Sequence, residues 1–188
     1  MEREDKILRE YESLRKEIAD ILAWQNTLYL FNFTAVSAIF AIAFSNDNPY
    51  LFLLTFLVLI PVRSRYIYHY EGMIRAATYI SVFLEPKLKG IAWETRLKKL
   101  EASFNKEFKS IIFQYFMSSI IGVFSYLFYF TNRSLTNNFW YDVILSTFPL
   151  LFVFYLIYIE IKNFNKSHIK KGEYIKRWIE VKNSENEI

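Results

Sequence analysis

Cysteine is absent from the 188 residues, and glycine and proline occur only four times each. The lack of cysteine excludes disulfide bonds, thiolate metal sites and cysteine nucleophiles. Only two histidines are present, so we expect no metal site and no cofactor. Because glycine and proline interrupt helices, their scarcity favours long helices over sheets and turns. The sequence therefore predicts an all-α protein.

Apolar and charged residues are segregated along the chain, although 53% of residues are hydrophobic and 22% are charged. Four apolar runs stand out, and we interpret each as a transmembrane span: 28–44, 49–62, 111–130 and 139–161. The second run is shorter than the roughly 20 residues that a span normally needs. Arg63 and Arg65 follow it, and we expect both to extend their charged ends to the membrane surface. The sequence thus predicts a single integral membrane domain, a four-span transmembrane helical bundle.

The stretches between the spans carry the charge. Residues 1–27, 63–110 and 162–188 hold 22 of the 23 Lys and Arg residues, which leaves Arg133 in an outer loop. By the positive-inside rule, we expect a cytoplasmic helix, a cytoplasmic helical hairpin and a cytoplasmic tail, in that order, with both termini inside a cell (inner) membrane. This topology accounts for the net charge of +4, and no direct nucleic-acid contact is expected.

Spans are expected to continue into long cytoplasmic helices. Before the first span, apolar side chains and one glutamine recur at a 4-3-4-3-4 spacing that places them on one helix face: Ile7, Tyr11, Leu14, Ile18, Ile21 and Gln25. This face packs on other cytoplasmic helices of the subunit or, alternatively, forms a coiled coil between subunits. A compact turn is predicted at 45–49, a helix end at Pro86, and a third helix from Trp93 into the third span.

The chain also resembles itself at two offsets. A shift of 95 residues places Tyr79, Phe83 and Glu85 over Tyr174, Trp178 and Glu180, and a shift of 90 aligns residues 16–22 with 106–112. We interpret this as a tandem duplication of a helix-span-span-helix unit, with repeats at 1–85 and 91–180. The alternative is chance similarity between helices of like composition.

Polar and small residues within the spans indicate where helices approach closely. Asn32 and Thr34 in the first span, and Ser118 and Gly122 in the third, predict packing of these two spans against each other, or a pore lining in an oligomer. The bulky second and fourth spans suit lipid contact. Because no Lys, Arg or His lies inside the spans and Glu160 lies near the end of the fourth, we expect no buried charge relay.

One cytoplasmic cluster has the composition of a ligand or partner face: Arg75, Tyr79, Glu85, Trp93, Glu94 and Arg96. Arginine and tryptophan together suit an anionic, stackable ligand such as a nucleotide. The structural alternative is that the two glutamates pair with Arg75 and Arg96 while Trp93 anchors the loop in the core. Neither a phosphate-binding glycine loop nor a nucleophile with a base is present, so we do not expect an enzyme.

The string Ile74–Glu94, with Tyr79-Ile80, Glu85-Pro86, Gly90 and Trp93-Glu94, resembles a signature of uncharacterised prokaryotic multi-span membrane proteins. In layout the chain is also similar to the SLATT-type and Kiwa-type membrane components of bacterial antiviral systems. The likeness implies a homo-oligomeric membrane effector or sensor whose cytoplasmic helices receive a ligand or a protein partner. A scaffold that anchors a soluble partner is the alternative, and a channel or a lipid-modifying enzyme is weaker.

Overall fold

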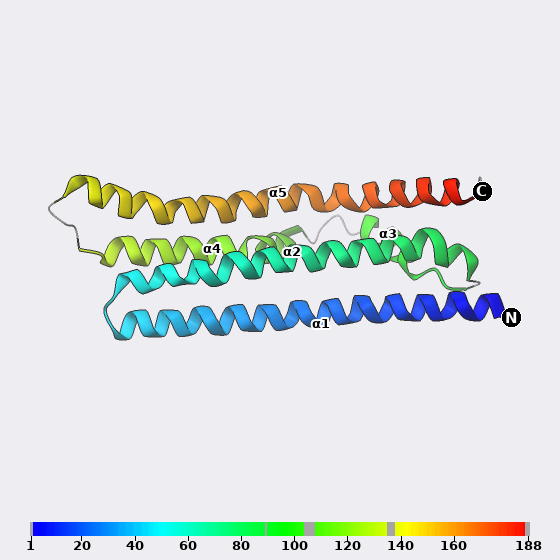
Figure 1. Cartoon of the computed structure of the whole chain (residues 1–188), viewed down its shortest axis with the longest axis horizontal. Helices are drawn as coiled ribbons and strands as arrows, with labels where there is room; N and C mark the ends of the chain where they lie inside the picture. The colour runs from blue at the N-terminus through cyan, green and yellow to red at the C-terminus, as the bar shows by residue number, and fades with distance from the viewer. Residues whose placement is uncertain (1, 89, 104–107, 135–137, 187–188) are drawn as a thin grey trace. The chain divides into compact units, whose positions relative to one another are not determined.

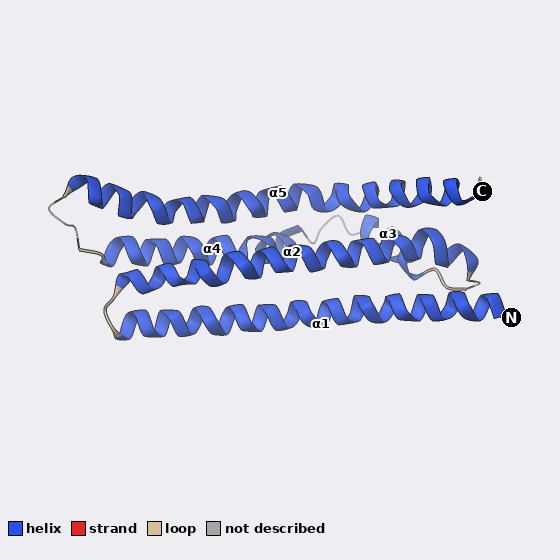
Figure 2. Cartoon of the chain, viewed as in Figure 1, coloured by secondary structure: helices blue, strands red, loops and turns tan. Residues whose placement is uncertain are grey.

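The protein is described by a computed structural model at residues 2–88, 90–103, 108–134 and 138–186. Within these ranges every regular element is helical and no strand occurs (Figure 1, Figure 2). The α-helices are α1 (Glu2–Ser45), α2 (Thr55–Tyr79), α3 (Trp93–Ser103), α4 (Phe108–Asn132) and α5 (Phe139–Asn186). The prediction of an all-α protein is confirmed.

Helix α1 runs without interruption through the predicted cytoplasmic helix and the first apolar run, as expected for a stretch without glycine or proline. It ends where Asn46 Nδ2 donates a hydrogen bond to the Ile42 carbonyl at 2.8 Å and Asp47 takes a positive φ of 48°. Asn48 Oδ1 then accepts from the Tyr50 amide at 3.1 Å, which begins the 3₁₀ helix η1 (Pro49–Leu54). The turn predicted at 45–49 is confirmed.

Helix α2 ends earlier than predicted. The α-helix stops at Tyr79 rather than at Pro86, and the chain continues through a π-helix, η2 (Ile80–Leu84), and a 3₁₀ turn, η3 (Glu85–Lys87). A π turn leaves backbone groups out of the α-helical pattern. Within this π-helix, the Val82 carbonyl accepts a hydrogen bond from Lys182 Nζ of α5 at 3.1 Å.

Helices α4 and α5 coincide with the third and fourth predicted apolar runs, and α5 extends beyond its run. Helix α3 begins at Trp93 as predicted, whereas its predicted passage into the third apolar run falls on residues 104–107, outside the described residues. Helix α4 carries the third run and α5 the fourth. Helix α5 also continues to Asn186, so the region predicted as a cytoplasmic tail is helical.

Three helical stretches are long and apolar enough to cross a membrane: Glu4–Ser45, Pro49–Lys87 and Phe139–Phe164. The apolar part of α4 is shorter and spans Phe116–Asn132. Within the three long stretches, only 17%, 28% and 22% of the most apolar window is buried inside the chain. Most of their hydrophobic surface therefore faces outward, as in a membrane protein.

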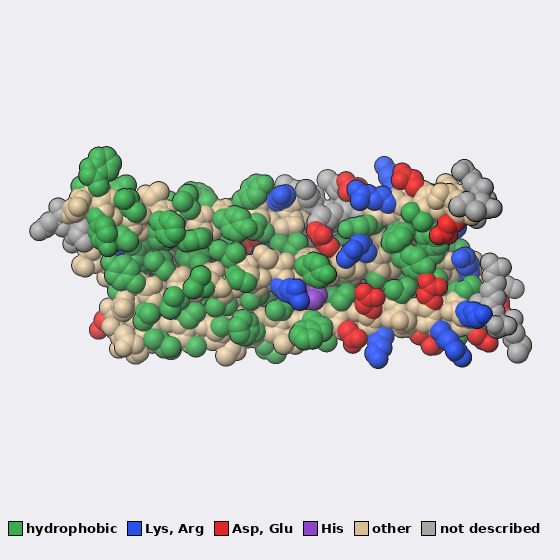
Figure 3. Space-filling model, in the orientation of Figure 1, with side chains coloured by type: hydrophobic (Ala, Val, Ile, Leu, Met, Phe, Trp, Pro, Cys, Tyr) green, Lys and Arg blue, Asp and Glu red, His purple; other side chains and the backbone are tan. Residues whose placement is uncertain are grey.

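Contacts divide the chain into two compact units. The charged unit comprises Met1–Gln25, Ile67–Lys109 and Asn165–Ile188, and the apolar unit comprises Asn26–Tyr66 and Ser110–Phe164. Figure 3 shows Lys, Arg, Asp and Glu side chains gathered over helix stretches of the charged unit, and mostly hydrophobic side chains over those of the apolar unit. Helices α1, α2 and α5 each supply residues to both units.

The core of the charged unit confirms the amphipathic face predicted for α1. Ile18 is buried with Ile80, Phe83 and Leu84, and the rest of this core consists of Ala76 and partly buried side chains that include Ile7, Tyr11, Leu14 and Trp178. Because these residues come from α1, the α2–η2 segment and α5, the face packs within the chain. The interpretation as packing inside the subunit is therefore confirmed for this face.

The core of the apolar unit gives the second and fourth apolar runs a packing role that was not predicted. Its buried residues come mainly from the second and fourth apolar runs: Phe52, Phe56, Leu59, Val153 and Leu156. Large side chains of α1, by contrast, are exposed, with 71% of Leu30 and 68% of Phe33 accessible. The second and fourth runs thus supply core residues as well as exposed apolar ones, because each of these helices places bulky residues on both of its faces.

Candidate functional site

A buried ion pair in the apolar unit was not predicted from the sequence. Arg63 near the middle of α2 and Glu160 of α5 are 4% and 0% exposed, and Arg63 Nε lies 3.6 Å from Glu160 Oε1. The second carboxylate oxygen accepts from the Ser119 amide of α4 at 3.3 Å. Three helices therefore meet at this carboxylate. The expectation that Arg63 extends to the membrane surface is wrong, whereas Arg65 is exposed.

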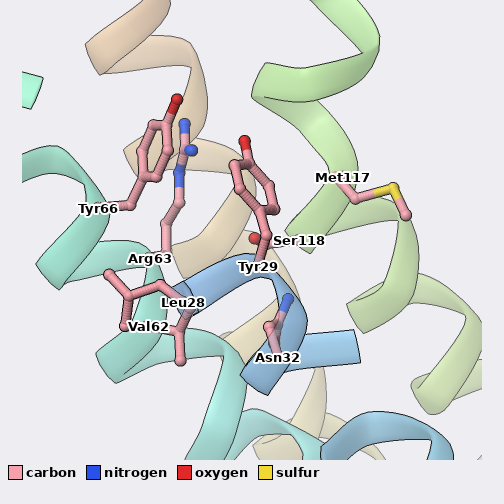
Figure 4. A pocket seen from close by; sticks show the side chains of 8 residues that line it. All are labelled: Leu28, Tyr29, Asn32, Val62, Arg63, Tyr66, Met117 and Ser118. Atoms are coloured by element: carbon pink, nitrogen blue, oxygen red, sulfur yellow. The ribbon is translucent and has the colours of Figure 1, made fainter. Parts of the chain in front are cut away.

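An aromatic ring packs against the guanidinium of Arg63. Its Cζ lies 5.3 Å from the ring centroid of Tyr66, a cation–π distance. The rings of Tyr66 and Tyr29 meet edge to face with centroids 5.4 Å apart. Figure 4 shows the Arg63 side chain extending beside Tyr66. Burial of the guanidinium is thus offset by the carboxylate of Glu160 and by the π face of Tyr66.

The residues predicted to pack the first span against the third divide into three cases. Asn32 and Ser118 are buried and line the same small cavity, so they do bring α1 and α4 together (Figure 4). Gly122 is buried, but a Cβ there would lie 3.0 Å from Leu156 Cδ1 and 3.3 Å from Phe56 Cε1, so it serves the approach of α5 and α2. Thr34 is exposed and takes no part in this packing.

In the charged unit, Glu85 caps the start of α3. Its carboxylate accepts from the amides of Glu94 at 2.6 Å and Thr95 at 3.1 Å, and from the Thr95 hydroxyl at 2.6 Å. The first amides of a helix have no partner inside the helix, and the helix dipole favours a negative charge there. The carboxylate of Glu85, which is 7% exposed, is therefore positioned to fix α3 rather than to contact a ligand.

Glu94 pairs with an arginine that lies outside the predicted cluster. Arg15 of α1 donates through Nη1 to Glu94 Oε1 at 2.9 Å, and its Cζ lies 5.6 Å from the ring centroid of Trp93. Trp93 is 54% exposed, so the expectation that it anchors the loop in the core is wrong. Trp93, Arg15 and Glu94 form a partly exposed group on the charged unit.

Tyr79 belongs to a second group, held by α1 and α5. Its hydroxyl donates to Glu10 Oε1 at 2.6 Å, and its ring meets those of Phe83 and Trp178 at centroid distances of 4.9 and 5.2 Å. Burial, followed by the hydrogen bond to Glu10, raises the pKa of Tyr79 to about 12. The phenol therefore stays neutral and acts as a hydrogen-bond donor across the physiological pH range.

Of the six residues predicted as a ligand or partner face, the structure brings Glu85, Trp93 and Glu94 together and places Tyr79 in the group with Glu10. Arg75 and Arg96 are exposed. Within the described residues, no group of three or more His, Asp or Glu side chains is arranged to hold a metal ion. No family model, curated protein or solved structure matches the chain.

Proposed function

We propose that the chain is an integral membrane protein with four spans, whose charged unit is cytoplasmic and receives a ligand or a protein partner. The observation that carries the membrane assignment is the exposure of large apolar side chains on α1, α2 and α5: Leu30, Phe33, Leu57, Ile144, Leu151 and Phe154 are between 58% and 73% accessible. In water such a surface is unfavourable, at about 25 cal/mol per Å² of apolar area. A bilayer removes it from water.

The shortest apolar helix of this proposal is α4, which carries the third of the four spans. Its exposed Phe124, Leu127 and Phe130 resemble the outward residues of the other spans, and α4 supplies Tyr129 to the same core. The proposed duplication also has support in one contact: Phe83 and Trp178, equivalent at the shift of 95 residues, meet with ring centroids 6.0 Å apart. Equivalent residues of two repeats meet when they lie near the axis that relates the repeats.

The absence of cysteine makes the topology directly testable. Single cysteines at five exposed positions report the side of the membrane after treatment of intact cells with an impermeant maleimide: Ser13, Ser45, Lys99, Ser134 and Ser184. Four spans with the charged unit inside predict labelling of Ser45→Cys and Ser134→Cys only, with the other three labelled after lysis. Labelling of Lys99→Cys in intact cells would overturn the topology.

We propose a non-enzymatic effector or sensor, acting as a homo-oligomer, as the function of this arrangement. Helices α1, α2 and α5 contribute to both units, so a ligand that favours one arrangement of the charged unit acts on elements that also build the apolar unit. The similarity in layout to SLATT-type and Kiwa-type components makes antiviral defence the setting to test. Its test is a plaque assay on cells that express the chain, paired with dye release from liposomes that contain the purified protein.

A membrane scaffold is the second candidate, and exposed apolar side chains on the charged unit favour it. Trp93, Ile179 and Val181 are 54%, 44% and 41% exposed among charged neighbours. Aromatic and aliphatic anchors of this kind are typical of protein-binding surfaces. A stoichiometric partner that co-purifies with the native chain, and is lost in Trp93→Ser, supports the scaffold. Dye release without any partner supports the effector.

A further inference from the structure

A small cavity lies in the apolar unit where α1, α2 and α4 approach one another (Figure 4). Its volume is about 20 Å³. The lining combines the polar side chains of Asn32, Arg63 and Ser118 with two tyrosines and three apolar side chains. A cavity with three polar groups in otherwise apolar surroundings has the lining of a binding site rather than of a packing defect.

Asn32 points to a ligand in this cavity. Its side chain is only 7% exposed, and its Oδ1 makes no hydrogen bond with any other described residue. A buried carbonyl oxygen without a donor is unfavourable, and most such groups in proteins are paired with protein or with ordered water. A ligand that donates a hydrogen bond to Asn32 Oδ1 removes this cost.

Charge and volume together select the ligand. Arg63 lines the cavity and is paired with Glu160 at 3.6 Å, so the two charges cancel. An anion beside Arg63 meets the carboxylate of Glu160, and a cation beside Glu160 meets the guanidinium, so a neutral ligand is favoured. Roughly 10–15 Å³ of such volume holds one water molecule, whereas a phosphate group needs more.

We propose that this cavity is a binding site for a single water molecule. The water donates a hydrogen bond to Asn32 Oδ1 and accepts one from Arg63 or from the Ser118 hydroxyl, which gives it the two to four polar partners that a buried water requires. It connects α1 to the ion pair between α2 and α5, and so extends the polar contacts across the core of the apolar unit. The site does not depend on the proposed effector or scaffold function.

A crystal structure of the full chain in a lipidic mesophase, grown with sodium bromide and at a resolution that shows water, tests the site. We expect one density peak without anomalous signal, about 2.7–3.2 Å from Asn32 Oδ1. An anomalous bromide peak, density for a lipid phosphate, or a cavity without any peak would each overturn the proposal.

Thermal unfolding of the full chain in detergent gives an independent test with opposite signs for the two outcomes. In Asn32→Leu, the larger apolar side chain displaces the water and removes the hydrogen bonds that it makes, so we expect a lower Tm. Were the cavity dry, the same substitution would remove an unpaired carbonyl and fill space, and Tm would rise or stay unchanged. Thr34→Leu, exposed on the same helix, is the matched control and should leave Tm nearly unchanged.

Discussion

Arg63 and Glu160 form an ion pair inside the apolar unit, with 3.6 Å between Arg63 Nε and Glu160 Oε1 and with almost no exposure of either residue. The distance exceeds that of a direct hydrogen bond. The two opposite charges nevertheless compensate each other in an environment that is largely shielded from solvent. Removing either side chain therefore leaves the other as a buried charge without its counter-charge.

Removing one member of this pair should be costly. Arg63→Met leaves the carboxylate of Glu160 buried without its cation, and we expect a loss of about 3–5 kcal/mol in unfolding free energy. Equilibrium unfolding in detergent measures it. The double variant Arg63→Met, Glu160→Met should recover most of the loss, since neither charge remains.

The matched control is Arg65→Met, because Arg65 is two residues away and exposed. We expect its effect to stay within about 0.5 kcal/mol. Equal losses in Arg63→Met and Arg65→Met would contradict a specific role for the buried pair, as would a double variant no more stable than Arg63→Met.

Gly122 should not tolerate a branched side chain. A Cβ there meets Leu156 and Phe56 at 3.0 and 3.3 Å, and valine adds two further carbons at that point. We expect Gly122→Val to cost about 1–3 kcal/mol through overpacking, measured as a fall in Tm. Gly172 offers the control, because a Cβ at Gly172 has no neighbour within 4 Å. Gly172→Val should leave Tm unchanged or raise it, and the opposite ranking would refute the close approach.

Glu85 should control the stability of α3 more than that of the rest of the chain. Glu85→Ala removes the acceptor for two helix-start amides and one hydroxyl, and we expect a local cost of about 0.5–2 kcal/mol. Hydrogen exchange of the amides at residues 94–97 measures this cost directly. Glu180→Ala, an exposed glutamate of α5, is the control, and equal protection of α3 in both variants would argue against the cap.

Tyr79 should make stability depend on pH in the alkaline range. Its pKa is raised to about 12 in the folded chain, against about 10 in the unfolded chain. The unfolded state therefore loses its proton first, so the contribution of Tyr79 is complete below about pH 10 and declines as the pH rises toward 12. Unfolding measured from pH 9 to 12 should show a steeper loss for the native chain than for Tyr79→Phe. Parallel profiles would exclude this contribution.

Glu10→Gln separates the effect of the Glu10 charge on the pKa of Tyr79 from the effect of burial. Burial remains in this variant, whereas the charge that the phenol faces is lost. We expect the pKa of Tyr79, followed by NMR of labelled tyrosine, to fall below its native value while remaining above 10. A pKa that does not move would show that the Glu10 charge contributes nothing and would leave burial and the charge of Glu185 as the causes.

Periodicity and apolar run length were sufficient to predict α1 and the apolar parts of α2 and α5, because both depend on residues close in sequence. The turn at 45–49 and the α1 face at Ile7–Ile18 follow from the same local signals. The ion pair does not, since Arg63 and Glu160 are far apart in sequence. A signal for the pair was present nonetheless. Arg63 directly follows the second apolar run and Glu160 is the last residue but one of the fourth, and the predicted topology places both of these run ends on the same side of the bilayer.

The capping role of Glu85 could not be predicted from the sequence for a different reason. A local helix cap is recognised by Ser, Thr, Asp or Asn next to the helix start, whereas Glu85 reaches α3 from a preceding turn. Similarly, the partner of Glu94 is Arg15 of α1, which no spacing within residues 63–110 could indicate. Local sequence patterns thus located the candidate face but did not identify which of its charged side chains form contacts within the chain.

The hydrogen bond from Lys182 to the Val82 carbonyl makes the last turns of α5 part of the folded protein. Truncation after Lys176 would remove both this donor and the indole of Trp178, which packs on Tyr79 and Phe83. A variant that lacks the end of α5 would therefore lose these contacts of α5 with the π turn and its neighbour Tyr79. Purification tags are better attached beyond Glu185, with a spacer, than in place of the final helical turns.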